Sequence, residues 1–388
     1  MKLAAVGVGQ AGGKILDRLL EYDVTRSTAF LSHAVAVNSA TADLAGLDRV
    51  PERDRLLVGG ATGGGDGAGT DPDVGERCVR EDLGGIENAV GRAATSDTDA
   101  FLVIAGLGGG TGSGGAPVVA ERLREIYAEP VYGLGILPAA DEGGIYSRNA
   151  ANSLQRFVDA ADNLLLFDND AARSSGETLS EGYEAINGEI ATRFGTLFSA
   201  GEIDALGDDV AESVVDASEI INTLGDRGIT SVGYASEVVE TADGGGLLDR
   251  FLGSDDEPEF AGEGDATNRI TALTRRATLG TLTLPCERDS ASRVLLIVSG
   301  PPEELSRKGI DAARSWLEET TACRTVRAGD YPLAGEDRVA VLVVLSGVTD
   351  APRIESLQEQ ATDSEAEAEK RERTSEAETR DLLEYGDD

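Results

Sequence analysis

Short apolar runs alternate with amphipathic segments through the first half of the chain. The apolar runs cover residues 3–9, 33–40, 99–108, 131–139 and 163–170, and segments with helical periodicity lie between them at 12–22, 72–93 and 114–128. A short apolar run predicts a strand buried on both faces, and an intervening helix predicts that successive strands are parallel. The pattern therefore predicts an α/β domain with a parallel sheet over residues 1–177.

A longer helical segment follows, from Thr178 to Ala200. Its apolar face includes Tyr183, Ile186, Ile190, Phe194 and Leu197. A helix that keeps one apolar face through several turns suits a buried position between two bodies. We therefore place a central helix and the start of the domain junction at residues 178–204.

The second half of the chain has strand-like runs with fewer helices between them. Runs at 228–235, 277–285, 292–300 and 337–347, with a clear helix at 303–321, predict a smaller mixed-sheet α+β domain over residues 205–348. Within it, the Gly-rich and acidic stretch 253–265 predicts a mobile loop. Residues 349–388 are polar and acidic, so we expect a disordered or loosely helical tail that can dock adaptor or cell-envelope proteins.

The charge balance excludes several classes of partner. The 388 residues include 71 acidic and 34 basic ones, a formal net charge of −37, and the only lysines are Lys2, Lys14, Lys308 and Lys370. So acidic a surface repels phosphate backbones and anionic headgroups, which disfavours nucleic-acid and membrane-surface binding. It suits a cytoplasm of high salt, where ions screen the repulsion. An anionic ligand must then be held locally, by backbone amides and without lysine.

Targeting, metal and histidine signals are weak. The N-terminus shows no signal-peptide pattern, and no stretch reaches the roughly 20 apolar residues of a membrane span. Cys78, Cys286 and Cys323 lack the spacing of a zinc site or a disulfide framework. His33, the only histidine, precedes an apolar strand and is expected to be structural.

A GxGxxG pattern at residues 7–12 lies between the first strand and the first helix, the context of a dinucleotide fold. The second strand ends at Asn38, however, and not at the acidic residue that holds a ribose in such folds. This difference disfavours an NAD-dependent oxidoreductase. A P-loop is excluded because Val8 and Ile15 stand where Gly and Ser or Thr are required.

The turn at 106–117 is the most informative one. Between a strand and a helix it holds Gly108, Gly109, Gly110, Thr111, Gly112, Ser113 and Gly114. A row of amides and two hydroxyls at a helix N-terminus forms a cradle for a diphosphate. A third Gly-rich turn, 63–72, also leads into a helix. Because parallel strands end at one edge of a sheet, the three turns together predict a nucleoside triphosphate held mostly by backbone.

The GGGTGSG sequence at 108–114 resembles the signature of the tubulin/FtsZ superfamily, and the similarity extends over most of residues 1–348. Within that superfamily the chain is most similar to CetZ, the tubulin-like proteins of haloarchaea. The resemblance implies a GTPase domain, a central helix, an activation domain and head-to-tail protofilaments. It also implies a cytoplasmic role in cell shape or motility rather than the central division role of FtsZ.

The resemblance further implies a set of GTP-binding residues. The first phosphate loop is Gly9, Gln10, Ala11, Gly12 and Gly13, the second is Gly108 to Gly114, and Ala68 and Gly69 meet the γ-phosphate. Asn169 and Asn187 match the asparagines that hydrogen-bond guanine, and an amide offers both a donor and an acceptor to a purine edge. Glu142 matches the acid that contacts the ribose.

The catalytic acids are expected to come from a neighbouring subunit. Residues 215–222 resemble the superfamily loop that supplies them, and Asp216 and Glu219 are spaced to lie on one side of a helical turn. They would orient a water at the γ-phosphate, and Mg²⁺ is expected there through phosphate and water oxygens, with no protein ligand assigned. The alternatives are a nucleotide-binding filament scaffold with little hydrolysis and, less well supported, the NAD-dependent oxidoreductase.

Overall fold

The computed structural model describes residues 1–92, 97–172, 179–200, 202, 215–239, 263–364 and 366. The strands are β1 Leu3–Val8, β2 Leu31–Asn38, β3 Arg55–Leu57, β4 Ala100–Gly106, β5 Val131–Leu137, β6 Asn163–Asp168, β7 Ile229–Val238, β8 Arg293–Gly300, β9 Val326–Pro332 and β10 Arg338–Val348. The helices are α1 Gly9–Arg26, α2 Thr41–Ala45, α3 Gly60–Gly63, α4 Pro72–Glu81, α5 Leu83–Gly91, α6 Thr111–Ile126, α7 Gly144–Ala160, α8 Asn169–Ala172, α9 Leu179–Ser199, α10 Ala217–Thr223, α11 Glu263–Gly280 and α12 Arg307–Thr321. A further helix covers residues 352–364.

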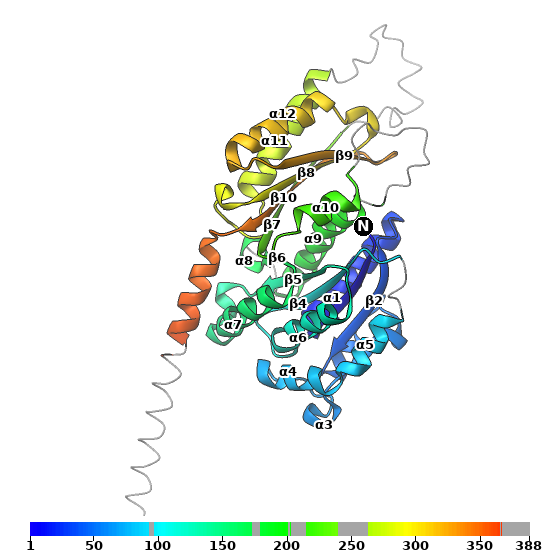
Figure 1. The fold of residues 1–388 in the computed structure, drawn as a ribbon, viewed down its shortest axis with the longest axis vertical. Helices are drawn as coiled ribbons and strands as arrows, with labels where there is room; N and C mark the ends of the chain where they lie inside the picture. Colours follow the sequence, from blue (N-terminus) through cyan, green and yellow to red (C-terminus); the bar gives the residue numbers. More distant parts are fainter. Residues whose placement is uncertain are drawn as a thin grey trace, which may run out of the picture.

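These strands form one continuous 10-stranded sheet in the order β3-β2-β1-β4-β5-β6-β7-β10-β8-β9 (Figure 1). Neighbouring strands from β3 to β6 are parallel, as the alternating pattern predicts. β10 is antiparallel to both β7 and β8, and β9 is parallel to β8. The predicted combination of a parallel-sheet domain and a smaller mixed-sheet domain is confirmed, and a short parallel pairing of β6 with β7 joins the parallel and mixed parts of the one sheet.

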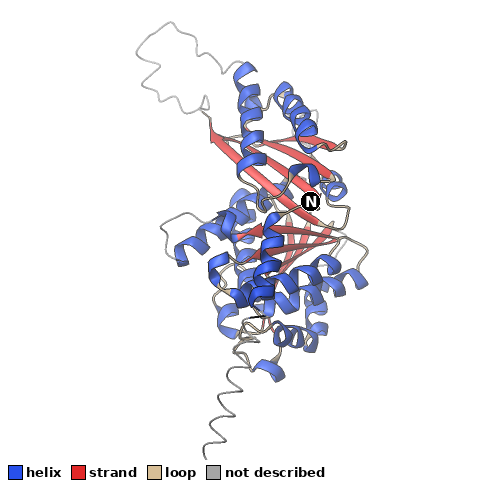
Figure 2. Cartoon of the chain, turned by 90° about the vertical axis from the view of Figure 1, so that its left-hand side faces the viewer, coloured by secondary structure: helices blue, strands red, loops and turns tan. Residues whose placement is uncertain are grey.

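Each face of the sheet packs against its own layer of helices (Figure 2). Side chains alternate along a strand, so Val6 and Val8 of β1 join one core and Leu3 and Ala5 join the other. The first core includes residues of α4, α5, α6, α7, α11 and α12. The second includes residues of α1, α2, α9 and α10. The fully buried strands explain why the apolar runs are continuous rather than alternating.

The central helix α9 runs alongside the parallel sheet, from the end where the strands finish to the end where they begin. The buried residues of its apolar face are Ile186, Ile190, Phe194 and Leu197. Tyr183, near its start, is 39% exposed. Near its end, the carbonyl of Phe198 accepts a hydrogen bond from the amino group of Met1 at 3.0 Å. Because β1 begins at Leu3, α9 ends at the edge where the parallel strands start.

The prediction of a strand at 277–285 is wrong. Residues 277–280 are the last turn of α11, and beyond it only Leu282 makes an isolated bridge, to Gly233. The buried residues Ile270, Leu273 and Ala277 keep the spacing of one helix face into this segment. Residues 277–280 therefore belong to α11, although apolar and polar residues alternate there as in a strand. The edge strands β3 and β9 have no predicted counterpart, because none of the residues of β3 is buried and fewer than half of those of β9 are.

The acidic segments differ in how much of them the structure describes. Residues 253–262 of the expected loop lie outside the described residues, and 263–265 begin α11. The helix at 352–364 falls within the expected tail, yet its Leu357 is fully buried against the core of the sheet. Apart from residue 366, the chain beyond 364 lies outside the described residues.

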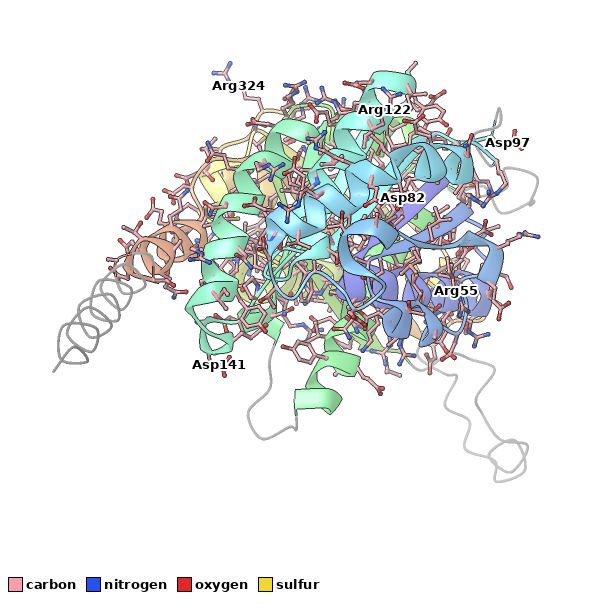
Figure 3. All side chains as sticks on the ribbon, turned by 90° about the horizontal axis from the view of Figure 1, so that it is seen from below. Arg55, Asp82, Asp97, Arg122, Asp141 and Arg324 are labelled. Atoms are coloured by element: carbon pink, nitrogen blue, oxygen red, sulfur yellow. The ribbon has the colours of Figure 1, made fainter. Side chains whose placement is uncertain are left out.

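Charged side chains cover the outer surfaces of the helices (Figure 3). Among the helices that the structure describes, none is long and apolar enough to cross a bilayer. Cys78, Cys286 and Cys323 are buried free thiols. The Nε2 atom of His33 lies 3.2 Å from the carbonyl oxygen of Ala89, between β2 and α5. These four residues lie outside the lining of the cavity described next.

Candidate functional site

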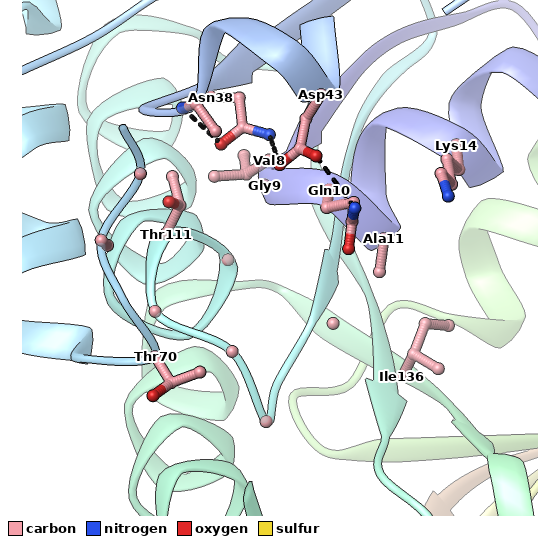
Figure 4. Close-up of a pocket in the computed structure, with 18 of the residues that line it drawn as sticks. Val8, Gly9, Gln10, Ala11, Lys14, Asn38, Asp43, Thr70, Thr111 and Ile136 are labelled. Carbon is pink, nitrogen blue, oxygen red and sulfur yellow. Dashed lines mark hydrogen bonds between the residues drawn. The ribbon is translucent and has the colours of Figure 1, made fainter. Parts of the chain in front are cut away.

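The three Gly-rich turns come together at one edge of the sheet. They follow β1, β3 and β4, and neighbouring parallel strands end at the same edge. The turns surround a cavity of about 520 Å³, drawn in Figure 4. A cavity of this size lies in the range of small-molecule and cofactor sites.

Most of the residues predicted to bind GTP line this cavity. They are Gly9, Gln10, Ala11, Ala68, Gly69, Gly108, Gly109, Gly110, Thr111, Gly112, Glu142, Asn169 and Asn187. The other predicted residues, Gly12, Gly13, Ser113 and Gly114, lie outside the lining.

Three of these four residues, Gly12, Ser113 and Gly114, lie where the turns pack against neighbouring elements. A Cβ on Gly12 would lie 2.2 Å from the carbonyl oxygen of Ile104, and one on Gly114 would lie 1.9 Å from that of Pro72. The hydroxyl of Ser113 donates to the carbonyl of Leu107. The two glycines therefore allow α1 to approach β4 and α6 to approach α4, which brings the helix starts to the cavity.

Two helices begin at the cavity, α1 with Gly9 and α6 with Thr111. The first amides of a helix have no partner within the helix, and the helix dipole favours an anion at that end. Gly9 has a φ of +74°, and a Cβ there would lie 2.8 Å from the amide nitrogen of Gly112. Glycine is thus required for the first and second turns to present their amides to the same space, which suits a phosphate chain.

The other end of the cavity carries amide and carboxylate side chains. Asn169 lies at the start of α8, directly after β6, and Asn187 lies on α9. The Oδ1 atom of Asn169 is buried without a hydrogen-bond partner, and its Nδ2 atom lies 3.5 Å from Oε1 of Glu142. A buried amide oxygen without a donor is costly, so this atom is placed to accept from a ligand.

A set of side-chain hydrogen bonds at the cavity was not predicted. Nε2 of Gln10 donates to Oδ1 of Asp43 at 2.9 Å, and Nδ2 of Asn38 donates to Oδ2 of Asp43 at 3.0 Å (Figure 4). Asn38 could have been found, because it ends β2 at the same edge. Asp43 could not have been predicted, because it lies on α2, and a helix of five residues is too short to show a periodic pattern in the sequence.

Asn149 of α7 was also missed. Its side chain is buried, and its Nδ2 atom donates to the carbonyls of Thr70 at 2.8 Å and Gly108 at 3.0 Å. These two bonds hold the second and third turns in a fixed relation to each other.

Lys14 corrects the expectation of a site without lysine. It lines the cavity together with Ala11, Tyr183 and Asn187, and Figure 4 shows it beyond Ala11 along α1. The spacing offered a signal, because Lys14 follows Gln10 by four residues and so lies on the same face of α1. One of the four lysines in the chain thus adds positive charge to a site built from amides.

Asp216 and Glu219 lie near the end of the sheet where the parallel strands begin, opposite the end that carries the cavity. Asp216 caps α10 and Glu219 lies within it, and neither lines the cavity. The end of α10 is held by Arg293, whose guanidinium donates to the carbonyl of Asn222. Arg293 begins β8, and the register through β10 and β7 places that residue near the start of β6. The starts of the parallel strands face away from the cavity.

The two carboxyl groups have opposite pKa shifts. Hydrogen bonds from the Ser218 hydroxyl and the Glu219 amide lower the pKa of Asp216. Burial raises the pKa of Glu219, and the neighbouring charge of Asp216 adds to that increase. Environments that separate two nearby carboxyl groups in this way are typical of pairs with different chemical roles.

The residues at the cavity fit a metal that arrives with its ligand. Within the described part of the chain, no three His, Cys, Asp or Glu side chains gather as a metal site. Asp43 and Asp66 line the cavity. Mg²⁺ is commonly held by one or two carboxylates together with phosphate oxygens and water, so these two groups fit a magnesium nucleotide.

Comparison with known proteins identifies the family. Residues 2–176 match the model of the tubulin/FtsZ family GTPase domain, and residues 176–363 match that of the tubulin-like CetZ C-terminal domain. The tubulin-like protein CetZ1 of Haloferax volcanii is 52% identical over 367 residues, which cover 94% of this chain and 93% of that relative. The chain belongs to the CetZ family of tubulin-like proteins. The resemblance inferred from residues 108–114 is confirmed.

Solved CetZ structures share the fold. The GDP-bound monomer of CetZ1 from Haloferax volcanii has a TM-score of 0.83 at 49% identity, covering 94% of this chain and 100% of that chain. The GTPγS-bound protofilament of CetZ2 from the same organism has a TM-score of 0.83 at 40% identity, covering 95% of this chain and 100% of that chain.

Proposed function

We propose that this chain binds GTP in the cavity, assembles head to tail into filaments, and hydrolyses GTP at the contact between subunits. The observation that carries the proposal is the separation of the cavity and the acids Asp216 and Glu219 at opposite edges of one sheet. Within one chain they stay apart, whereas a head-to-tail contact brings the acids of one subunit over the cavity of the next. A contact of this type that does not close into a ring generates a filament.

The cavity suggests how the nucleotide lies. The phosphates occupy the space in front of the α1 and α6 N-termini, with Ala68 and Gly69 at the γ-phosphate. The base lies between Asn169 and Asn187, and Glu142 accepts from the ribose. The GDP-bound CetZ1 and GTPγS-bound CetZ2 structures support a guanine nucleotide here.

Hydrolysis requires a water oriented at the γ-phosphate, which is a matter of positioning and electrostatics. Asp216 and Glu219 of the adjoining subunit would supply the carboxylates that orient it. Bound Mg²⁺ would offset the phosphate charge; of the two carboxylates that line the cavity, Asp66 is the one for it, because both oxygens of Asp43 accept from Gln10 and Asn38.

The self-association is supported by the CetZ2 protofilament. We propose that the filament works in the cytoplasm, in control of cell shape or motility, with the acidic tail as a docking segment for envelope or adaptor proteins. Electron microscopy of the purified full chain in molar salt, with GTP, with GDP and without nucleotide, tests assembly. Filaments are expected with GTP, and their absence in all three conditions would overturn the assembly proposal.

A mixing experiment separates hydrolysis between subunits from a scaffold that hydrolyses little. Glu219→Ala subunits keep the cavity, and Gly109→Ala subunits keep the acids. In a mixed filament with random order, about one quarter of the contacts pair an intact cavity with intact acids. The mixture should therefore regain GTP turnover that neither variant shows alone. Turnover of wild-type protein that does not depend on protein concentration would contradict the intersubunit mechanism.

A further inference from the structure

Arg353, on the helix at residues 352–364, makes a buried contact with the end of β6. Its Nε atom lies 3.2 Å from both carboxylate oxygens of Asp168, and its Nη2 atom donates to the carbonyl of Pro138 at 2.7 Å. The side chains of Arg353 and Asp168 are 9% and 3% exposed. A planar guanidinium that engages a carboxylate and a carbonyl at once fixes geometry as well as charge.

The same guanidinium reaches the turn that carries the ribose-side acid. Nη2 of Arg353 lies 3.3 Å from Oδ2 of Asp170. The carboxylate oxygens of Asp170 in turn accept from the amide of Ala140 at 3.1 and 2.9 Å. Ala140 begins the short turn that ends at Glu142. Arg353 therefore holds the ends of β5 and β6 and the turn before α7 in one arrangement.

These contacts surround Asn169. It stands between Asp168 and Asp170, and both it and Pro138 line the nucleotide cavity. Its Oδ1 atom is buried without a partner. Neither carboxylate beside it can supply a donor, because ionised carboxylates only accept hydrogen bonds. The backbone that Arg353 holds thus sets where this amide oxygen points.

We propose that Arg353 is a positioning residue that sets Asn169 to accept a hydrogen bond from the guanine base and thereby couples docking of the helix 352–364 to nucleotide binding. The inference rests on the proposed GTP function and goes beyond it, because it makes a C-terminal helix part of the base specificity. The 2-amino group of guanine is the donor that we assign to this amide oxygen. Hypoxanthine lacks the 2-amino group.

The coupling runs in both directions. A contact that improves nucleotide affinity when the helix is docked must, by linkage, hold the helix more firmly when nucleotide is bound. The helix also contacts α7, where the hydroxyl of Ser147 donates to Oε1 of Gln360 at 3.1 Å. The acidic segment beyond residue 364 continues from this helix, so a protein that pulls on that segment would change nucleotide affinity.

The test compares GTP and ITP affinities of the full chain in molar salt, for wild type, Arg353→Ala, Arg353→Lys and the control Arg124→Ala. Arg124 makes matching contacts away from the cavity, to the Asp162 carboxylate at 3.0 Å and to the carbonyls of Asp159 and Ala160. A hydrogen bond to the base is worth about fivefold in affinity. The ratio of GTP to ITP affinity should fall about fivefold in Arg353→Ala and remain unchanged in Arg124→Ala.

Hydrogen exchange supplies a second readout. GTP should slow amide hydrogen exchange in residues 352–364 of the wild type and of Arg124→Ala. In Arg353→Ala, which lacks the coupling contact, GTP should leave the exchange of these residues unchanged. If Arg353→Ala does not fold, Arg353→Lys decides, since lysine keeps the charge without the fork and should lower the ratio by a smaller factor.

An unchanged GTP to ITP ratio in folded Arg353 variants would overturn the inference and leave GTP binding intact. Wild type that binds both nucleotides equally would also overturn it. Wild type that binds neither nucleotide would instead refute the proposed function on which it rests.

Discussion

Replacing Gly109 by alanine should weaken nucleotide binding without weakening the fold. Gly109 lines the cavity, and a Cβ built on it meets no protein atom within 4 Å. Its φ is not among the positive values in the chain, so alanine fits the backbone. Alanine there should stabilise the folded chain by about 0.4–1 kcal/mol, because it restricts the unfolded state.

The loss of affinity follows from where the methyl group points. It would occupy the space in which a phosphate meets the amides of the turn, and so remove one or two charge-assisted hydrogen bonds of about 1.5–3 kcal/mol each. A net loss of about 2–4 kcal/mol corresponds to a roughly 30- to 1000-fold weaker complex. Affinity and stability should therefore change in opposite directions.

Titration with fluorescent GTP and thermal unfolding without nucleotide measure the two quantities. Gly84→Ala is the matched control, since Gly84 is exposed on α5 with no atom within 4 Å of its Cβ position. It should gain about 1 kcal/mol of stability and bind GTP normally. Gly12→Ala should lose about 1–3 kcal/mol of stability, because its Cβ would overlap the Ile104 carbonyl. Wild-type affinity in Gly109→Ala would refute the placement of the phosphates.

Four further outcomes follow from the structure. Asp216→Asn keeps an oxygen to cap α10 but loses the charge, so its thermal melting should match that of wild type while its GTP turnover falls at least about tenfold. Asp216→Ala loses the cap too, and should therefore also lose about 1 kcal/mol of stability. GTP turnover should rise with pH through the raised pKa of Glu219, because the ionised carboxylate orients water, and a pH profile without this limb would count against Glu219. Lys14→Ala should weaken GTP binding about tenfold by titration, and the same loss in Lys308→Ala, on α12, would show that only overall charge matters. Light scattering should show assembly that increases with salt, because the chain carries a charge of −37, and equal assembly in dilute buffer would contradict that reasoning.

The sequence by itself determined the parts of the fold that depend on neighbouring residues. The apolar runs predicted β1, β2, β4, β5 and β6 within about two residues of most of their bounds, since a buried strand needs only a continuous apolar segment. The Gly-rich turns predicted which backbone lines the cavity, because only glycine allows the approach seen at Gly9. The alternation of apolar and polar residues at 277–285 wrongly predicted a strand, because Ala277 packs into the core as part of helix α11.

The tertiary structure alone decided which distant residues meet at the site. Asn149 reaches two turns 79 and 41 positions away, and Arg353 reaches Asp168 across 185 positions. Periodicity carries no information about such pairs, because they depend on the order of strands in the sheet and on which helix covers which strand end. The same order places the cavity and the acids Asp216 and Glu219 at opposite ends of the strands, the separation on which the proposed head-to-tail assembly rests.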